Sequence, residues 1–272
     1  MNLKSIVKKV IDLPLWSLGL EIRAKHKIHP VDESPIVISN EIELAPEHSP
    51  NQWLIDKKIK TVLDIGANTG QFAATIHEII PKARIVSFEP LKDCYKELLR
   101  NGENLGSFKA YNCALGTEEG KVTIYRSEFS PSSSLLPMGD LHKEAYPFTK
   151  NGTEEKVKVR KLDKIKRLGI TYPLLVKIDV QGFEDKVIDG GYKTIREASV
   201  LIVEASFQTL YEGQPMFDDI YARLKKLGFS YHGNWYQDND SRNGSALQAD
   251  AIFIKTESPR NLVQKTINSL NK

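Results

Sequence analysis

The chain has 272 residues, enough for one large α/β domain with its own core, and its 38 Lys and Arg residues nearly balance its 35 Asp and Glu residues, for a formal net charge of +3. This balance argues against a large basic surface that binds nucleic acid. No apolar run approaches the roughly 20 residues that a membrane-spanning helix needs. The two cysteines, Cys94 and Cys113, do not require a disulfide framework, so reduced thiols in a cytoplasmic protein are expected.

The first 29 residues differ in pattern from the rest of the chain. Apolar residues recur there at helical spacing with lysines between them, namely Leu3, Ile6, Val7, Val10 and Ile11. The pattern predicts a basic amphipathic helix, which either docks on the domain or on a second subunit of a homo-oligomer, or rests peripherally on an anionic membrane surface. Prolines then punctuate a connector, so an N-terminal extension is expected over residues 1–48.

Strand and helix signals alternate along residues 49–258, which favours a mostly parallel sheet with helices on both faces. Strands are predicted over residues 61–65, 84–88, 108–113, 121–125, 174–178, 200–203, 229–232 and 249–254, and helices over residues 71–80, 93–101, 183–189 and 217–227. The last two strands are candidates for antiparallel pairing across a polar loop, residues 234–244. A C-terminal helical tail is expected over residues 259–272.

A long segment without sustained periodicity, residues 127–156, interrupts this alternation and is rich in Ser, Pro and Gly. Structureless segments of this length in a compact domain are usually functional loops or lids. Regular structure is expected to resume at Val157.

The sharpest motif runs from Asp64 to Gly70, between a predicted strand and a predicted helix, where glycines allow the backbone to approach a ligand closely. It lacks both the lysine of a phosphate-binding GxxxxGK[ST] loop and the GxGxxG spacing of dinucleotide enzymes. Glu89 ends the second strand, where a carboxylate accepts both hydroxyl hydrogens of a ribose, although a lone acidic residue at a strand end is often only a helix cap. Together the two features favour an adenosine site.

Five motifs in order, residues 63–70 (LDIGANTG), 87–90 (SFEP), 112–116 (NCALG), 162–165 (LDKI) and 177–184 (KIDVQGFE), resemble the motif series of the FkbM family of S-adenosylmethionine-dependent methyltransferases. The resemblance covers about Thr61 to Lys255. It implies an α/β fold with a Rossmann-like class I methyltransferase sheet of seven strands, the last antiparallel, and O-methylation of hydroxyl groups, often on sugars or polyketides.

The resemblance also implies a set of residues that bind S-adenosylmethionine, comprising Asp64, Gly66, Ala67, Asn68, Gly70, Glu89, Pro90, Asn112, Cys113, Ala114 and Asp179. Within this set, the first turn lines the methionine portion, Glu89 the ribose, and residues 112–114 the adenine edge. Asp179 is placed against the reacting methyl group.

Methyl transfer from a sulfonium requires an acceptor oxygen in line with the sulfur–carbon bond, so positioning supplies much of the rate. A carboxylate that orients the acceptor hydroxyl or takes its proton makes Asp179 the first catalytic candidate and Glu204 the second. Glu184 follows, although a first-turn helix carboxylate there is slightly more expected than catalysis. His142 is a general-base candidate, but a lone loop histidine is more often an exposed bystander.

Many relatives carry Glu at the position of Gln181, so one carboxylate is absent here and no metal site is predicted. A Mg²⁺ ion held by Asp179, Glu184 and Glu204 stays open as the alternative, although carboxylates at adjacent strand ends are common without metal. The serines Ser132, Ser133 and Ser134 resemble a cluster that family members place near the ligand. Three aromatic residues are candidates for an acceptor wall: Tyr211, Trp235 and Tyr236.

The sequence thus predicts an O-methyltransferase that acts on a hydroxyl of a small molecule or glycan precursor, with no nucleic-acid partner. An NAD-dependent oxidoreductase stays open as an alternative, because such enzymes also place a glycine-containing turn after one strand and an acidic residue at the end of the next. So does a non-catalytic scaffold that retains the nucleotide fold, because a fold does not establish turnover.

Overall fold

The computed structural model describes residues 51–256 of the chain. The chain divides into two compact units, residues 1–56 and residues 57–272, and each is described by itself. Of the first unit, the structure describes one short helix, α2 (Gln52–Ile55). The amphipathic helix expected in residues 1–29, the membrane contact assigned to it and the tail expected in residues 259–272 lie outside the described residues.

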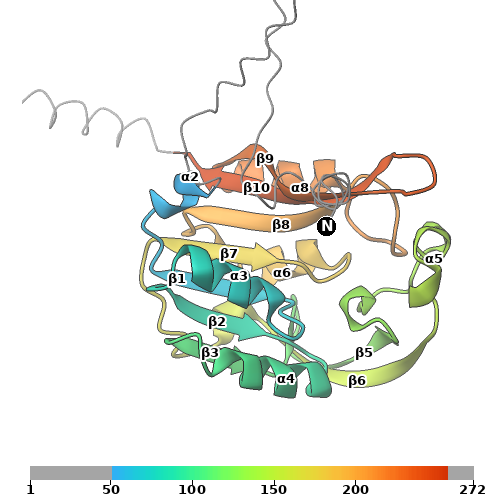
Figure 1. Cartoon of the computed structure of the whole chain (residues 1–272), viewed down its shortest axis with the longest axis horizontal. Helices are drawn as coiled ribbons and strands as arrows, with labels where there is room; N and C mark the ends of the chain where they lie inside the picture. Colours follow the sequence, from blue (N-terminus) through green and yellow to red (C-terminus); the bar gives the residue numbers. More distant parts are fainter. Residues whose placement is uncertain (1–50, 257–272) are drawn as a thin grey trace, which may run out of the picture. The chain divides into compact units, whose positions relative to one another are not determined.

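A seven-stranded sheet forms the centre of the second unit, with the strand order β3-β2-β1-β7-β8-β10-β9 (Figure 1). Its strands are β1 (Thr61–Ile65), β2 (Arg84–Phe88), β3 (Phe108–Tyr111), β7 (Leu174–Ile178), β8 (Val200–Ser206), β9 (Phe229–Asn239) and β10 (Ala246–Lys255). The neighbouring strands β3, β2, β1, β7 and β8 pair in parallel. Strand β10 pairs antiparallel with both β8 and β9. The expected seven-stranded α/β sheet with an antiparallel last strand is confirmed.

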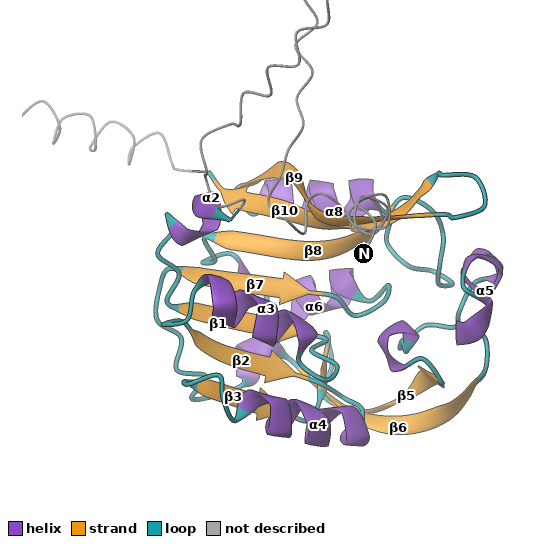
Figure 2. Cartoon of the chain, viewed as in Figure 1, coloured by secondary structure: helices purple, strands orange, loops and turns teal. Residues whose placement is uncertain are grey.

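Helices cover both faces of this sheet, with α3 and α4 on the front face and α6 and α8 behind it in Figure 2. They are α3 (Gln71–Ile79), α4 (Lys92–Gly102), α6 (Glu184–Gly190), α7 (Tyr192–Ile195) and α8 (Phe217–Lys226). Because both faces are covered, the central strands are apolar on both sides, and all five residues of β1 and of β7 are buried. Among residues 51–256, no helix has the length and apolar character needed to cross a bilayer.

The predicted loop at residues 234–244 is wrong over most of its length, because β9 continues through Asn239 and the turn to β10 occupies residues 240–245. The polar side chains in this stretch do not interrupt the strand, since β9 pairs with β10 through backbone hydrogen bonds and exposes much of its surface. Similarly, β8 extends three residues beyond its predicted end at Val203, so Glu204 lies inside the strand rather than after it.

The long segment of residues 127–156 is not structureless. A second, three-stranded sheet has the order β4-β6-β5 and consists of β4 (Ala114–Leu115), β5 (Gly120–Ser127) and β6 (Gly152–Arg160). Between β5 and β6 the chain forms η2 (Ser130–Ser132), α5 (Asp140–Ala145) and η3 (Pro147–Thr149), and η4 (Leu162–Lys164) follows β6. Helical turns therefore lie within this segment, and the next strand begins at Gly152, before the predicted Val157. We call residues 128–150 the lid segment.

The order of the strands places a crevice between β1 and β7. After β1 the chain builds β2 and β3 on one side, and it returns later to add β7 on the other side. In open α/β sheets ligands bind at such a switch point, outside the carboxyl ends of the strands. The turns after Ile65 and Ile178 border this crevice, and both carry the motifs identified in the sequence.

Candidate active site

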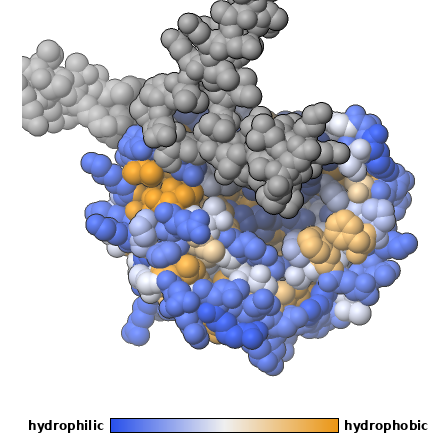
Figure 3. Space-filling model, viewed as in Figure 1, coloured by the Kyte–Doolittle hydropathy of each residue, from blue (hydrophilic) through white to orange (hydrophobic). Residues whose placement is uncertain are grey.

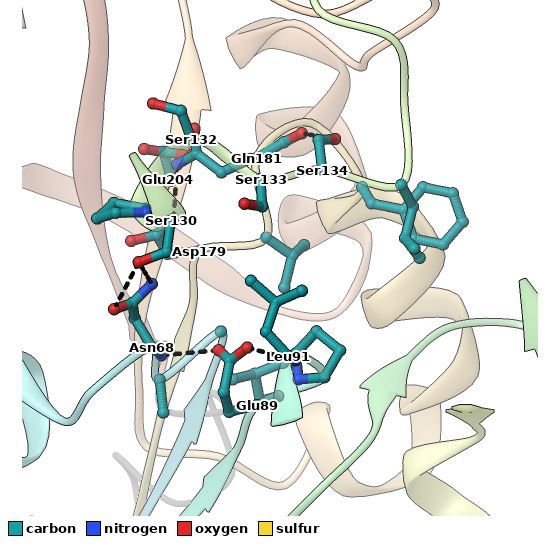
Figure 4. A pocket seen from close by; sticks show the side chains of 18 of the residues that line it. Asn68, Glu89, Leu91, Ser130, Ser132, Ser133, Ser134, Asp179, Gln181 and Glu204 are labelled. Carbon is teal, nitrogen blue, oxygen red and sulfur yellow. Dashed lines mark hydrogen bonds between the residues drawn. The ribbon is translucent and has the colours of Figure 1, made fainter. Parts of the chain in front are cut away.

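A cavity of about 460 Å³ lies at the carboxyl ends of the central strands (Figure 4). Its volume is typical of sites that bind small molecules, and such sites are usually concave with a few convergent polar groups. Its wall includes most of the predicted site residues, namely Gly66, Ala67, Asn68, Glu89, Pro90, Cys113, Ala114, His142, Asp179 and Glu204.

The turn after β1 is shaped by a close approach between two backbones. Gly66 has a φ of +83°, and a Cβ atom there would lie 1.7 Å from the carbonyl oxygen of Asp179. The amides of Gly66 and Ala67 both donate to the carbonyl of Phe88 at 3.0 Å, which ties the turn to β2. Only glycine fits at position 66, because the residue must adopt the left-handed region and leave room for the turn after β7.

Glu89 follows β2 and supplies a carboxyl group to the cavity wall near the turn after β1. Its Oε2 accepts the amide of Asn68 at 2.8 Å, and its Oε1 accepts the amide of Leu91 at 2.7 Å (Figure 4). Burial raises the pKa of Glu89 to about 7, although the two backbone hydrogen bonds oppose the rise. The side chain is thus fixed at the cavity wall with lone pairs left for further hydroxyl donors.

Three members of the predicted cofactor set are not in the cavity wall. Asp64 is fully buried on β1, where its Oδ2 accepts the hydroxyl of Ser87 at 3.2 Å. Asn112 donates to the carbonyls of Glu89 and Pro90, both at 2.9 Å, and so braces the turn after β2. Gly70 begins α3 with a φ of +100°. These residues support the site from behind, and their assignment to direct cofactor contact stays a prediction.

Asp179 follows β7 and forms an ion pair with a buried lysine. Its Oδ2 lies 2.8 Å from Nζ of Lys177, whose side chain is 8% exposed, whereas that of Asp179 is 28% exposed. Burial alone would raise the pKa of Asp179, but Lys177 and the amide of Gln181 hold it below its ordinary value. Asp179 therefore presents an ionised carboxylate to the cavity at neutral pH.

Gln181 connects Asp179 to Glu204 through its side-chain amide. Nε2 donates to Oδ1 of Asp179 at 2.9 Å and to Oε2 of Glu204 at 2.7 Å, while Oε1 accepts the hydroxyl of Tyr211 at 2.7 Å. Burial, followed by the charges of Asp179 and Glu184, raises the pKa of Glu204 well above its ordinary value. Burial thus favours the neutral form of Glu204, whereas Lys177 favours the charged form of Asp179.

Glu184 has a structural role in this arrangement. Its Oε1 accepts the amides of Val180 at 3.0 Å and of Gly182 at 3.1 Å, which fixes the turn between β7 and α6. This geometry favours the helix-terminus interpretation of Glu184 over catalysis. Within residues 51–256, no group of three or more His, Cys, Asp or Glu side chains is arranged to hold a metal ion.

The serine cluster closes one side of the cavity. Ser130, which the sequence analysis did not select, accepts the side-chain amide of Asn68 at 3.0 Å, and Ser134 donates to the carbonyl of Gln181 at 2.6 Å (Figure 4). Ser132, Ser133 and Ser134 all line the cavity. The serines therefore attach the lid segment to the turns after β1 and β7.

His142 is not the exposed loop residue that a lone histidine usually is. It lies in α5, is 2% exposed, and packs between the rings of Tyr146 and Tyr211, with both centroid distances 5.0 Å. Burial lowers the pKa of His142 to about 4, so the imidazole is neutral at pH 7. Of the aromatic candidates, Tyr236 lines the cavity, whereas Tyr211 and Trp235 are not in its wall.

Several wall residues were not predicted from the sequence: Lys177, Tyr146, Asp238, Gln248 and Asp250. Lys177 carried a usable signal, since a lysine inside a five-residue apolar strand is almost never buried without a charged partner. The other four depend on the pairing of β9 with β10 and on the fold of the lid segment. No local pattern marks them as neighbours.

Comparison with known proteins identifies a family and several relatives. Residues 64–231 match the model of the methyltransferase FkbM domain. The chain is 29% identical over 169 residues to the 2-O-methyltransferase NoeI of Sinorhizobium fredii, a match covering 59% of this chain and 69% of NoeI. It is 28% identical over 149 residues to the hexuronic acid methyltransferase AglP of Haloferax volcanii, covering 52% of this chain and only 54% of AglP.

Among solved structures, magnesium protoporphyrin IX methyltransferase (ChlM) from Synechocystis PCC 6803, determined with bound SAM, aligns with a TM-score of 0.39 at 14% identity. The alignment covers 75% of each chain.

Proposed function

The chain belongs to the FkbM family of S-adenosylmethionine-dependent methyltransferases, and from this premise we propose that it transfers the methyl group of S-adenosylmethionine to a hydroxyl of a saccharide or glycan precursor. The observation that carries the proposal is the position of Asp179 in the cavity. This ionised carboxylate follows β7, the central strand of the sheet, with the turns after β1, β2 and β3 on one side and β8, β10 and β9 on the other.

The described residues fit the proposed cofactor. Gly66 lets the turns after β1 and β7 approach each other closely at the switch point, and Glu89 offers acceptor lone pairs for ribose hydroxyls. Bound S-adenosylmethionine supplies an electrophilic methyl group on a cationic sulfur. A wall that contains the ionised Asp179 and several further carboxyl groups favours such a cation electrostatically.

The proposed role of Asp179 is to orient the acceptor hydroxyl and accept its proton. Lys177 and Gln181 fix both carboxylate oxygens, which limits the rotation of the side chain and keeps it ionised. Burial of the neighbouring Glu204 raises its pKa and favours its neutral form, which disfavours a second negative charge next to Asp179. The residues thus position the hydroxyl more than they activate it.

Calorimetric titration tests the cofactor assignment directly. We expect saturable binding of S-adenosylmethionine and S-adenosylhomocysteine, and none of NAD. Incorporation of labelled methyl into a saccharide acceptor would then establish the reaction. Preference for NAD, or absence of binding by both sulfur nucleosides in folded protein, would refute the proposal.

Asp179→Asn is expected to lower kcat/KM for methyl transfer about 100-fold or more, because the acceptor hydroxyl loses its charged hydrogen-bond acceptor and proton acceptor. The melting temperature and the affinity for S-adenosylhomocysteine serve as checks that the variant is folded. Asp218→Asn, at an exposed position in α8, is the matched control and is expected to retain activity. A kcat/KM for Asp179→Asn within threefold of the parent would exclude the proposed role.

Cofactor affinity is expected to depend on pH through Glu89. Because its pKa is about 7 without ligand, and an ionised carboxylate accepts ribose hydroxyls more strongly than a protonated one, binding favours the ionised form. The uncharged nucleoside 5′-methylthioadenosine should therefore bind about tenfold more weakly at pH 6 than at pH 8. Glu89→Gln should abolish this dependence, whereas Glu78→Gln, at an exposed site in α3, should keep it. A flat profile for the parent protein would argue against ribose recognition by Glu89.

A further inference from the structure

Two rows of side chains cross the strands β8, β10 and β9 on the face that borders the cavity. In the first row Glu204 pairs with Asp250, which pairs with Tyr236. In the second row Gln248 pairs with Asp238. Gln248 lies two residues before Asp250 on β10, and Asp238 lies two residues after Tyr236 on β9. Because residues two apart on a strand share a face, these five side chains form one polar surface, which we call the platform. All five line the cavity.

The lid segment supplies the aromatic wall of the same part of the cavity. Tyr146 donates its hydroxyl hydrogen to Asp238, which joins the lid segment to the platform. Phe148 contacts Tyr146 edge to face with centroids 6.3 Å apart, and its side chain is 62% exposed. In Figure 3, apolar surface appears among hydrophilic residues on the side of the molecule that carries the lid segment. Aromatic rings beside hydrogen-bonding groups match the alternating C–H and O–H surface of a sugar ring.

Two buried polar groups in the wall lack partners within the described part of the chain. Neither ring nitrogen of His142 has a hydrogen bond, and the residue is 2% exposed. The side-chain oxygen of Gln248 is also buried without a partner. Buried polar atoms are rarely left unsatisfied, so each is matched to a ligand group or to water. A neutral imidazole offers one donor and one acceptor, which is the complement of a hydroxyl.

The sheet order separates this region from the cofactor side. The turns that hold the proposed cofactor residues follow β1, β2 and β3, whereas β10 and β9 form the opposite edge. The acceptor is therefore expected over the platform, with Asp179 between the two ends of the cavity.

The charge of the wall restricts the chemistry of that acceptor. Among the described residues, five acidic side chains line the cavity, namely Glu89, Asp179, Glu204, Asp238 and Asp250. Because burial favours the neutral form of Glu204, the charge of the platform comes from its two aspartates. Within residues 51–256, Lys177 is the one lysine or arginine that lines this wall, and it already forms an ion pair with Asp179. A carboxylate on the acceptor would face the charges of the platform, and the described part of the wall offers it no free cation. Such unpaired charges are strongly disfavoured in a partly buried site.

We propose that the platform and the lid segment form an acceptor subsite for a neutral, polyhydroxylated sugar ring and discriminate against rings that carry a carboxylate. This inference rests on the proposed function and names the acceptor class for the same site. The subsite would distinguish this chain from a relative that methylates a hexuronic acid.

The test compares neutral methyl hexopyranosides with the methyl glycosides of the matching uronic acids. Binding is measured by saturation-transfer NMR on the complex with S-adenosylhomocysteine, and turnover with labelled S-adenosylmethionine. The parent protein is expected to prefer the neutral ring at least tenfold.

A positive charge introduced on the platform provides the specific test of this preference. Gln248→Arg, which places a cation among the platform residues, should reduce the preference tenfold or more. Gln237→Arg places the same cation on the other face of β9, between Tyr236 and Asp238, and should change the preference less than twofold. Asp238→Asn, which preserves size and a partner for Tyr146, should move the preference in the same direction as Gln248→Arg.

Equal or tighter binding of the uronates by the parent protein would overturn the inference, as would failure of every neutral glycoside to bind. Methyl transfer to a uronate hydroxyl would leave the proposed function standing while refuting the acceptor class. Loss of cofactor binding in the calorimetric titration would instead refute the proposed function, so the two failures are distinguishable.

Discussion

Gly66→Ala is expected to destabilise the protein by at least about 3 kcal/mol and to abolish binding of S-adenosylhomocysteine. The added methyl group would lie 1.7 Å from the carbonyl oxygen of Asp179, a backbone atom that cannot rotate away. The residue also has a φ of +83°, which L-amino acids with a side chain rarely adopt. Relief of the clash requires the turns after β1 and β7 to separate, and these turns carry the site.

Gly213→Ala separates the clash from the backbone strain. Gly213 has a φ of +73°, and nothing lies within 4 Å of the position of its Cβ, so the substitution should cost about 1 kcal/mol from conformation alone. Urea denaturation of both variants measures the difference, and calorimetry shows whether the cofactor still binds. Similar losses for the two variants would show that the close approach at Gly66 is not what stabilises the switch point.

The central strands were predictable because they are buried on both faces. A strand in that position needs apolar residues at nearly every site, so β1, β2 and β7 appear in the sequence as short apolar runs with clear ends. The structure places all three where the pattern predicts them. The half of the cavity that we propose for the cofactor follows from these strands, because the residues after each carboxyl end must lie at one edge of the sheet.

The other half of the cavity was not predictable in the same way. The start of β9 was predicted as a strand over residues 229–232, but residues 234–239 are mostly polar and were predicted as a loop. Their regularity comes from backbone pairing with β10. The lid segment likewise lacks a period, because α5, η2 and η3 are each shorter than two helical turns. Asp238 and Tyr146 are 92 residues apart, so their contact depends on tertiary structure alone.

Glu204 and His142 illustrate how environment decides a role that residue type leaves open. The sequence suggested each as a candidate base, yet burial favours the uncharged form of both. Burial raises the pKa of the carboxyl group and lowers that of the imidazole, because it disfavours the charged form of each. Asp179 alone of the three candidates has an adjacent cation, and this contact with Lys177 separates its chemistry from theirs.

Lys177→Met is therefore expected to have the second large effect, a loss of about 3–5 kcal/mol in unfolding free energy at pH 8. Burial disfavours the charged lysine, but Asp179, Asp64 and Asp250 surround it and hold its pKa above the ordinary value. Methionine has a similar length without the charge, so the variant leaves these carboxyl groups without their cation. Lys82→Met, at an exposed position, is the matched control and should change stability by less than about 0.5 kcal/mol.

The pH dependence of this loss identifies its cause. In the parent protein the pKa of Asp179 is lowered by folding, so its contribution to stability is present above the unfolded pKa and disappears as the pH falls. Without Lys177, burial raises the folded pKa above the unfolded value, so the variant binds protons on folding and loses stability as the pH rises. Chemical denaturation at pH 5.5 and pH 8 should therefore show a larger difference between variant and parent at pH 8. An equal difference at both pH values would attribute the loss to packing. It would also show that Lys177 is not what lowers the pKa of Asp179.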